Sequence, residues 1–220
     1  MKVIIDSKEY ECQPDQNLLD VARQNGIDIP TLCFNPLTTE IRHAGCRLCV
    51  VEVKAGGRLG LGSSCTMPVA EGLTISTTSE AVYNERRLVL ELLLSEHVQD
   101  CQNCPMSGDC IFAKLCRDYD VDGVSVCAEC PNQKEGCLLK RHVLCLGPIT
   151  YANCDAYCTR AGYRCEGCHS VLGKDEVIRF GLKAYADAGF AKNEILQAAK
   201  VYSYDAMNRL ARIMKEEGFE

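Results

Sequence analysis

Cysteine is the residue type whose number and spacing point most directly to chemistry in this sequence. The chain holds 17 cysteines among 220 residues, and none of them falls within residues 171–220. Thiols at this density form disulfides or bind soft metals, such as zinc and the iron of iron–sulfur clusters. Disulfides are disfavoured because the chain is long enough to build a core, 17 is an odd number, and MKVIID reads as a strand with no signal peptide before it. We therefore expect metal-ligating thiolates in a reducing, cytoplasmic environment.

A first group of four cysteines has the spacing C-x12-C-x2-C-x15-C and consists of Cys33, Cys46, Cys49 and Cys65. The close pair lets two sulfurs reach one metal centre without strain, and the neighbouring glycines allow backbone N–H groups to approach cluster sulfurs. Zinc is the alternative, although zinc sites usually pair two C-x2-C or histidine elements and this stretch has one. Cys12 lies outside the pattern, and we interpret it as a small buried residue.

A second group has the spacing H-x3-C-x2-C-x5-C and consists of His97, Cys101, Cys104 and Cys110. A lone histidine is usually a packed or surface side chain, but this one precedes a close cysteine pair at the end of an apolar helix. Ligation by His97 is therefore the favoured interpretation. Cys116 follows one helical stretch later, and we interpret it as packed.

A third group contains eight cysteines within 42 residues. They are Cys127, Cys130, Cys137, Cys145, Cys154, Cys158, Cys165 and Cys168. Eight thiolates make two sets of four, but spacing does not decide which four share a centre, since neighbouring clusters can exchange a ligand. We expect little room for a hydrophobic core here, so that metal binding supplies the folding energy. Two zinc sites are the alternative.

The elements that position the first group form a small α+β sheet with one packed helix. KVIID and EYECQ read as two strands joined by a turn at residues 6–8, and VVEV and LTIST as two later strands. Between them QNLLDVARQNG predicts a helix with Asp15 as the N-cap and Gly26 just past its end.

Two further helical regions follow. The leucine-rich stretch EAVYNERRLVLELLLSEH predicts a strongly apolar, buried helix that leads to His97. Residues 171–220 predict a tail of two or three amphipathic helices, one ending at Gly189, one starting on Asn193, and a last one with Met207 and Leu210 on its apolar face. We favour a tail that buries its own core over a docking face for a partner.

The first two groups carry a resemblance to a known family. PTLCF, AGCRLCVVEV, SSCTMPV and TIST, followed by SEHVQDCQNCPMSGDC, resemble the N-terminal iron–sulfur region of the complex I large peripheral-arm subunit and of the diaphorase small subunit of NAD-linked hydrogenases. The resemblance implies a β-grasp [2Fe–2S] ferredoxin domain over residues 1–80. It also implies a [4Fe–4S] segment with one histidine and three cysteine ligands over residues 81–120. Imidazole in place of a thiolate should raise that cluster's potential.

The third group resembles a different segment. CAEC, GCLLKRHVLCLGPITYANCDAYC and YRCEGCHS are similar to the C-terminal cluster segment of cytoplasmic [NiFe]-hydrogenase small subunits. This resemblance implies two [4Fe–4S] clusters over residues 121–170, in a segment with little regular structure, before the helical tail of residues 171–220. The expected cofactors are therefore one [2Fe–2S] and three [4Fe–4S] clusters.

The expected function is electron transfer without an active site of the chain's own. No G-x-G-x-x-G motif, P-loop or nucleophile elbow is present, and we find no flavin or nicotinamide site. The resemblances imply a cytoplasmic NAD(P)-linked hydrogenase complex, a class that includes electron-bifurcating enzymes. The implied partners are a flavin-containing NAD(P)-reactive subunit, a thioredoxin-like [2Fe–2S] subunit, and the small and large subunits of a [NiFe] hydrogenase.

Two alternatives stay open. One is an iron–sulfur subunit of another NADH-linked complex, such as a formate dehydrogenase or an NADH–ferredoxin oxidoreductase, and the other is a zinc-stapled interaction scaffold. The net charge of −6 without a basic stripe disfavours nucleic acid as a partner, and no apolar run is long enough for a membrane span.

Overall fold

The computed structural model describes residues 1–33 and 44–219. Contacts divide the chain into two compact units, unit 1 from Met1 to Ser95 and unit 2 from Glu96 to Glu220. No helix within the described part of the chain is both long and apolar enough to cross a membrane.

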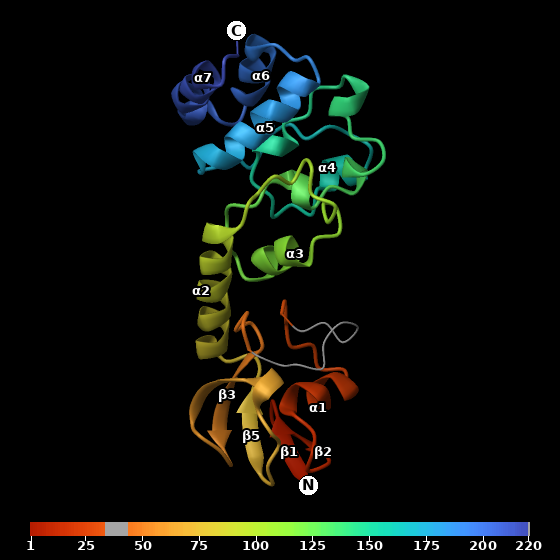
Figure 1. Ribbon diagram of the computed structural model, residues 1–220, viewed down its shortest axis with the longest axis vertical. Coiled ribbons are helices and arrows are strands. Elements are labelled where there is room, and N and C mark those ends of the chain that lie inside the picture. The colour runs from red at the N-terminus through yellow and green to blue at the C-terminus, as the bar shows by residue number, and fades with distance from the viewer. Residues whose placement is uncertain (34–43, 220) are drawn as a thin grey trace. The chain divides into compact units, whose positions relative to one another are not determined.

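Unit 1 is built on a five-stranded mixed sheet with the strand order β2-β1-β5-β3-β4 (Figure 1). The strands β1 and β5 run parallel, and the other neighbouring pairs are antiparallel. The bounds are β1 Lys2–Ile5, β2 Lys8–Glu11, β3 Val50–Ala55, β4 Gly60–Ser63 and β5 Leu73–Ser76. The predicted α+β class is confirmed, with one strand more than predicted, because the glycine-rich β4 lacks the apolar alternation that marks a strand.

Helix α1 (Leu18–Gln24) packs its apolar face into the core of unit 1, where Leu18, Leu19 and Val21 are fully buried. The predicted N-cap at Asp15 is wrong. The side chain of Asn17 accepts the capping hydrogen bond from the backbone N–H of Asp20 at 3.1 Å. Gly26 has φ +73° and follows the C-cap residue, as predicted.

Helix α2 (Glu80–Glu96) is less buried than its leucine content suggests. Val82, Leu90 and Leu94 are buried, but Leu88 is 51% exposed and Leu92 is 60% exposed within the described structure. The prediction of a wholly buried helix is therefore wrong for one face of α2. A buried arginine, Arg86, takes a position on the inner face, which an apolar count cannot reveal.

Unit 2 alternates short helices with 3-10 turns. The α-helices are α3 Ile111–Asp118, α4 Tyr157–Arg160, α5 Asp175–Asp187, α6 Lys192–Ala199 and α7 Met207–Glu216 (Figure 1). The 3-10 turns include η2 Val126–Ala128, η3 Pro131–Gln133, η4 Leu139–Arg141 and η5 Gly147–Ile149. The tail helices form as predicted, except that α6 starts at Lys192, and the carboxylate of Glu194 accepts from the Ala191 N–H at 2.8 Å.

The core of unit 2 joins the cysteine-rich segment to the helical tail. Leu146 and Ile149 of the CLGPIT stretch are buried in the same cluster as Ile178, Leu182 and Tyr185 of α5. The prediction that this segment has little hydrophobic core is therefore wrong, because the tail helices supply the missing apolar surface. A Cβ at Gly181 would lie 2.7 Å from Cγ2 of Ile149, so α5 approaches η5 closely only because that residue is glycine.

Candidate metal centres

The first cysteine group gathers at one end of the β3–β4 hairpin. Cys49 immediately precedes β3, Cys65 lies in the 3-10 turn after β4, and the two thiols interact with each other. The hydroxyl and the N–H of Ser64 both donate to the Cys49 carbonyl, at 2.8 and 3.0 Å. Cys33 and Cys46 form a second interacting thiol pair. Long-range folding thus brings all four predicted ligands to one region of unit 1.

Backbone N–H groups prepare part of this group to be ionised. Burial raises the pKa of the Cys65 thiol to about 12, and burial also raises the pKa of Cys33. At Cys46 burial raises the pKa too, but N–H donors, among them that of Leu32 at 3.4 Å from Sγ, outweigh burial and leave the pKa below its usual value. A thiolate that accepts N–H hydrogen bonds is the ligand form that iron requires.

Arg86 supports the backbone on either side of Cys49, the second cysteine of the close pair. Its Nε donates to the Leu48 carbonyl at 3.1 Å and its Nη2 to the Val50 carbonyl at 2.8 Å, on either side of Cys49. Arg86 is only 5% exposed. Sequence reasoning missed this residue because its partners lie more than 30 positions earlier in the chain.

The second group lies on the loop before α3. The Cys101 thiol interacts with Cys104 and Cys110, and burial raises its pKa to about 11. Cys110 is the N-cap of α3, where its Sγ accepts from the Ala113 N–H at 3.4 Å. The ring of His97, an exposed residue, packs edge-on against Phe112 with centroids 5.1 Å apart, close in sequence to Cys110. Ligation by His97 stays a prediction.

Two side chains near this group are buried, those of Cys116 and Gln99, and only Cys116 fits a purely packing role. Cys116 is buried, and burial raises the pKa of its thiol to about 12, as fits a packed residue. Gln99 is 4% exposed, and neither its Oε1 nor its Nε2 has a hydrogen-bond partner in the described structure. An unsatisfied buried amide costs about 1–3 kcal/mol. An amide in need of an acceptor, two residues before Cys101, fits a site for a cluster that carries sulfide acceptors.

The first four cysteines of the third group line one apolar pocket. These are Cys127, Cys130, Cys137 and Cys145. Cys127 is buried, which raises the pKa of its thiol well above the usual value. Gly147 borders the sulfurs, since a Cβ there would lie 3.4 Å from the Cys127 Sγ and 3.7 Å from the Cys145 Sγ. Four thiols that line the same pocket suit a single cluster.

The last four cysteines lie around α4. The thiol of Cys154 interacts with those of Cys165 and Cys168, and Cys158 lies within α4 itself. The Cys165 N–H donates to the Cys145 Sγ at 3.3 Å, so the two halves of the third group adjoin. Within the described residues, no three or more His, Cys, Asp or Glu side chains are arranged to hold a single metal ion.

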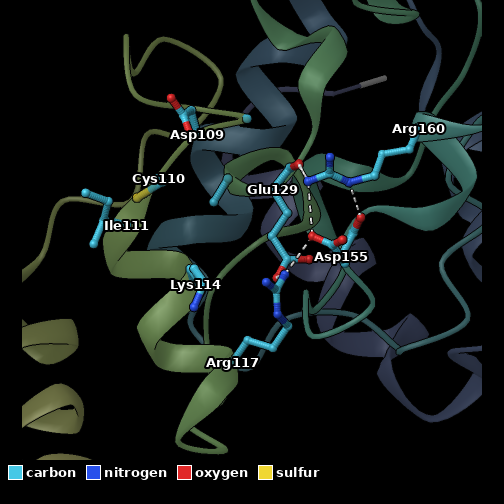
Figure 2. A pocket seen from close by; sticks show the side chains of 10 residues that line it. Asp109, Cys110, Ile111, Lys114, Arg117, Glu129, Asp155 and Arg160 are labelled. Carbon is cyan, nitrogen blue, oxygen red and sulfur yellow. Dashed lines mark hydrogen bonds and ion pairs between the residues drawn. The ribbon is translucent and has the colours of Figure 1, made fainter. Parts of the chain in front are cut away.

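An ion-pair network ties α3 to the third group (Figure 2). Arg117 of α3 contacts the carboxylates of Glu129 and Asp155 at 2.9 and 2.8 Å, and Arg160 contacts Asp155 at 3.0 Å. The buried Glu129 lies between Cys127 and Cys130 and also accepts from the Ala156 N–H at 3.2 Å. These residues line a pocket of about 130 Å³ beside Cys110. The two guanidinium groups pair with the carboxylates of Glu129 and Asp155, so the network fixes the cysteine-bearing loops.

Comparisons with known proteins give two family matches, both within residues 1–125. The family described as "2Fe-2S iron-sulfur cluster binding domain" matches residues 1–80, and the one described as "NADH-ubiquinone oxidoreductase-G iron-sulfur binding region" matches residues 86–125. Residues 1–80 are thus similar to [2Fe–2S] cluster binding domains, and residues 86–125 are similar to the iron–sulfur binding region of NADH-ubiquinone oxidoreductase-G proteins. The second match ends before the eight-cysteine group begins.

Relatives of this iron–sulfur region include both hydrogenase subunits and complex I subunits. "NADP-reducing hydrogenase subunit HndD" of Solidesulfovibrio fructosivorans is 40% identical over 55% of this chain and 21% of its own length. The gamma subunit of the NAD-reducing hydrogenase HoxS of Cupriavidus necator is 30% identical over 56% of this chain and 49% of its own length. The mitochondrial "NADH-ubiquinone oxidoreductase 78 kDa subunit" of Candida albicans is 30% identical over 56% of this chain and 16% of its own length.

One solved structure is also similar. A chain of an NAD+-reducing [NiFe]-hydrogenase in the H2-reduced state is 33% identical, with a TM-score of 0.48 over 54% of this chain and 48% of that chain. The present chain thus spans about half or less of the length of the relatives it matches.

Proposed function

We propose that this chain is an electron-transfer subunit that relays single electrons through one [2Fe–2S] and three [4Fe–4S] clusters. The observation that carries the proposal is that the sequence motifs, once folded, gather their thiols into separate groups with N–H donors at the sulfurs. Such donors reach Cys46, Cys110 and Cys145, one in each of three groups. Bound clusters would supply the one-electron chemistry, while the chain supplies ligands, hydrogen bonds and exclusion of water.

The proposed ligand sets follow the thiol groups. In the β-grasp domain Cys33, Cys46, Cys49 and Cys65 hold the [2Fe–2S] cluster. A [4Fe–4S] cluster is held by His97, Cys101, Cys104 and Cys110. The shared pocket supports Cys127, Cys130, Cys137 and Cys145 as one further set. The last set is then Cys154, Cys158, Cys165 and Cys168, three of which interact.

The proposed setting is a cytoplasmic NAD(P)-linked [NiFe] hydrogenase complex, a class that includes electron-bifurcating complexes. The chain passes electrons between a flavin-containing NAD(P)-reactive subunit, with its thioredoxin-like [2Fe–2S] partner, and the hydrogenase small and large subunits. The relatives named as NAD- and NADP-reducing hydrogenase subunits support this setting, as does the hydrogenase-like motif of residues 125–170. Another NADH-linked complex, such as a formate dehydrogenase or an NADH–ferredoxin oxidoreductase, is the second candidate, supported by the complex I relatives.

Metal analysis after anaerobic purification tests the cluster content. The expected result is about 14 iron atoms per chain with acid-labile sulfide, together with EPR signals of both [2Fe–2S] and [4Fe–4S] types. Zinc without sulfide would instead support the interaction scaffold and defeat the proposal.

Purification of the chain with its native partners tests the setting. We expect the complex to reduce NAD(P) with hydrogen as the electron donor, and mass spectrometry of the intact complex to find hydrogenase subunits. A complex that contains iron–sulfur clusters but no hydrogenase subunit would move the assignment to another NADH-linked enzyme.

A further inference from the structure

Gln102 connects two cysteine groups that lie apart in the sequence. It stands between Cys101 and Cys104, two proposed ligands of the second group, and its side chain reaches a cysteine of the third group. Its amide Nε2 is directed at the Sγ of Cys127, the first cysteine of the third group, and is in contact with it. A ligating thiolate carries no proton and can only accept, so the amide N–H must be the donor.

Two further contacts fix the Gln102 loop against the Cys127–Cys130 turn. The side-chain Nε2 of the buried Gln133 donates to the main-chain carbonyl of Gln102. The Gly108 N–H donates to the Ala128 carbonyl at 2.9 Å. Gly108 has φ +85°, and a Cβ there would lie 2.5 Å from the Cys130 carbonyl oxygen. The loop therefore packs directly against this turn. These contacts fix the position of Gln102 relative to Cys127.

We propose that Gln102 sets the reduction potential of the cluster ligated by Cys127, through an N–H hydrogen bond to that sulfur. This inference rests on the proposed function. Reduction adds a negative charge to a cluster, and a hydrogen-bond donor at a ligand sulfur stabilises the more negative state. The effect is strong here because Cys127 is buried, so water does not compete for the sulfur.

The same contact links the second cysteine group to the third. The residue is covalently part of the second group's loop and hydrogen-bonded to a sulfur of the third group, so one side chain joins the two proposed ligand sets. Gln102 is a positioning and tuning residue, since it acts on the cluster through a ligand.

The test compares Gln102→Met and Gln102→Glu with the unchanged chain. Methionine keeps an unbranched side chain of similar length without a donor, and glutamate keeps the shape but replaces the donor with a negative charge. EPR-monitored redox titration of the full-length, cluster-loaded chain measures each midpoint, and iron and sulfide are counted in parallel. A Cys127→Ser variant identifies which signal belongs to the Cys127 cluster.

We expect Gln102→Met to lower the midpoint of that one signal, with about a tenfold change in its reduced-to-oxidised ratio at a fixed potential, which equals ~59 mV. We expect Gln102→Glu to lower it further. Asn103→Met is the matched control, because the Asn103 amide lies in the same loop but donates to the Asp100 carboxylate, at 2.9 and 3.1 Å. It should leave every midpoint unchanged.

Three results would overturn the inference. They are an unmoved midpoint at full iron content, an equal shift in the Asn103 control, and a loss of iron from both Gln102 variants, which would make the residue structural. Failure of the proposed function would look different, because the chain without any substitution would then contain no iron and no sulfide.

Discussion

Arg86 allows a quantitative test of how unit 1 holds its close cysteine pair. Two of its hydrogen bonds, 3.1 and 2.8 Å long, reach the carbonyls of Leu48 and Val50 on either side of Cys49. A hydrogen bond to a charged group contributes about 1.5–3 kcal/mol, and loss of the donor leaves buried carbonyls unsatisfied. Arg86→Met keeps the apolar stem and removes the donors, so we expect the free energy of unfolding of unit 1 to fall by roughly 3 kcal/mol.

Anaerobic urea denaturation of the full chain measures this loss, with far-UV circular dichroism and the visible absorption of the [2Fe–2S] cluster as signals. For a urea dependence of about 1–3 kcal/mol per M, the midpoint of unit 1 shifts down by roughly 1–3 M.

The matched control is Arg87→Met, one position along the same helix. The Arg87 Nε pairs with Glu91 at 3.1 Å, and the two side chains are 47% and 48% exposed, so a change of about 0.5 kcal/mol or less is expected. Equal midpoints for the Arg86 and Arg87 variants would refute the argument that the buried donors hold the cysteine turn.

Three other predictions concern unit 2. His97→Cys should keep its [4Fe–4S] cluster but lower its midpoint in a redox titration, because a thiolate adds negative charge; an unchanged midpoint would mean that His97 is not a ligand. Tyr185→Phe removes the hydroxyl that donates to the Cys145 carbonyl at 3.0 Å in a fully buried position, and should cost about 1–2 kcal/mol in urea denaturation; unchanged stability would contradict this. Hydrogen bonds from Arg209 and Arg212 lower the pKa of Asp175, so its stabilising effect is fully present above the unfolded pKa of about 3.9 and is lost only as the pH falls through the lowered value. The stability difference between the unchanged chain and Asp175→Asn should therefore stay constant from pH 7 to pH 5, and a decline in that range would disprove the pairing.

Local patterns were enough to predict most of the secondary structure. The alternation in KVIID and VVEV and the turn at residues 6–8 predicted strands that are present, since side-chain period and turn chemistry are local properties. The errors fall where tertiary contacts decide. β4 forms because it pairs with β3, as Val50 with Ser63, and not because of its own glycine-rich composition.

The candidate sites could likewise be predicted where the signal is local, and not where it depends on tertiary contacts. C-x2-C spacing identifies thiols that share a centre, because two sulfurs three residues apart can reach one metal unaided. The assignment of Cys137 and Cys145 to the pocket of Cys127 needs the fold, since spacing alone allowed several partitions. Arg86 and Gln102 could not be foreseen, because each acts on a cysteine segment 25 or more positions away.

The helical tail explains why so many thiols can be ordered in so short a segment. Ile149 is fully buried against α5, and the hydroxyl of Tyr185 holds the Cys145 carbonyl from the same helix. The cysteine loops therefore share an apolar core with the tail helices, and a ligand set built on such support is preorganised. We expect this support to keep the ligand geometry similar in both oxidation states of the proposed clusters, so that the proposed hydrogen bond from Gln102 can act on the potential without a movement of the chain.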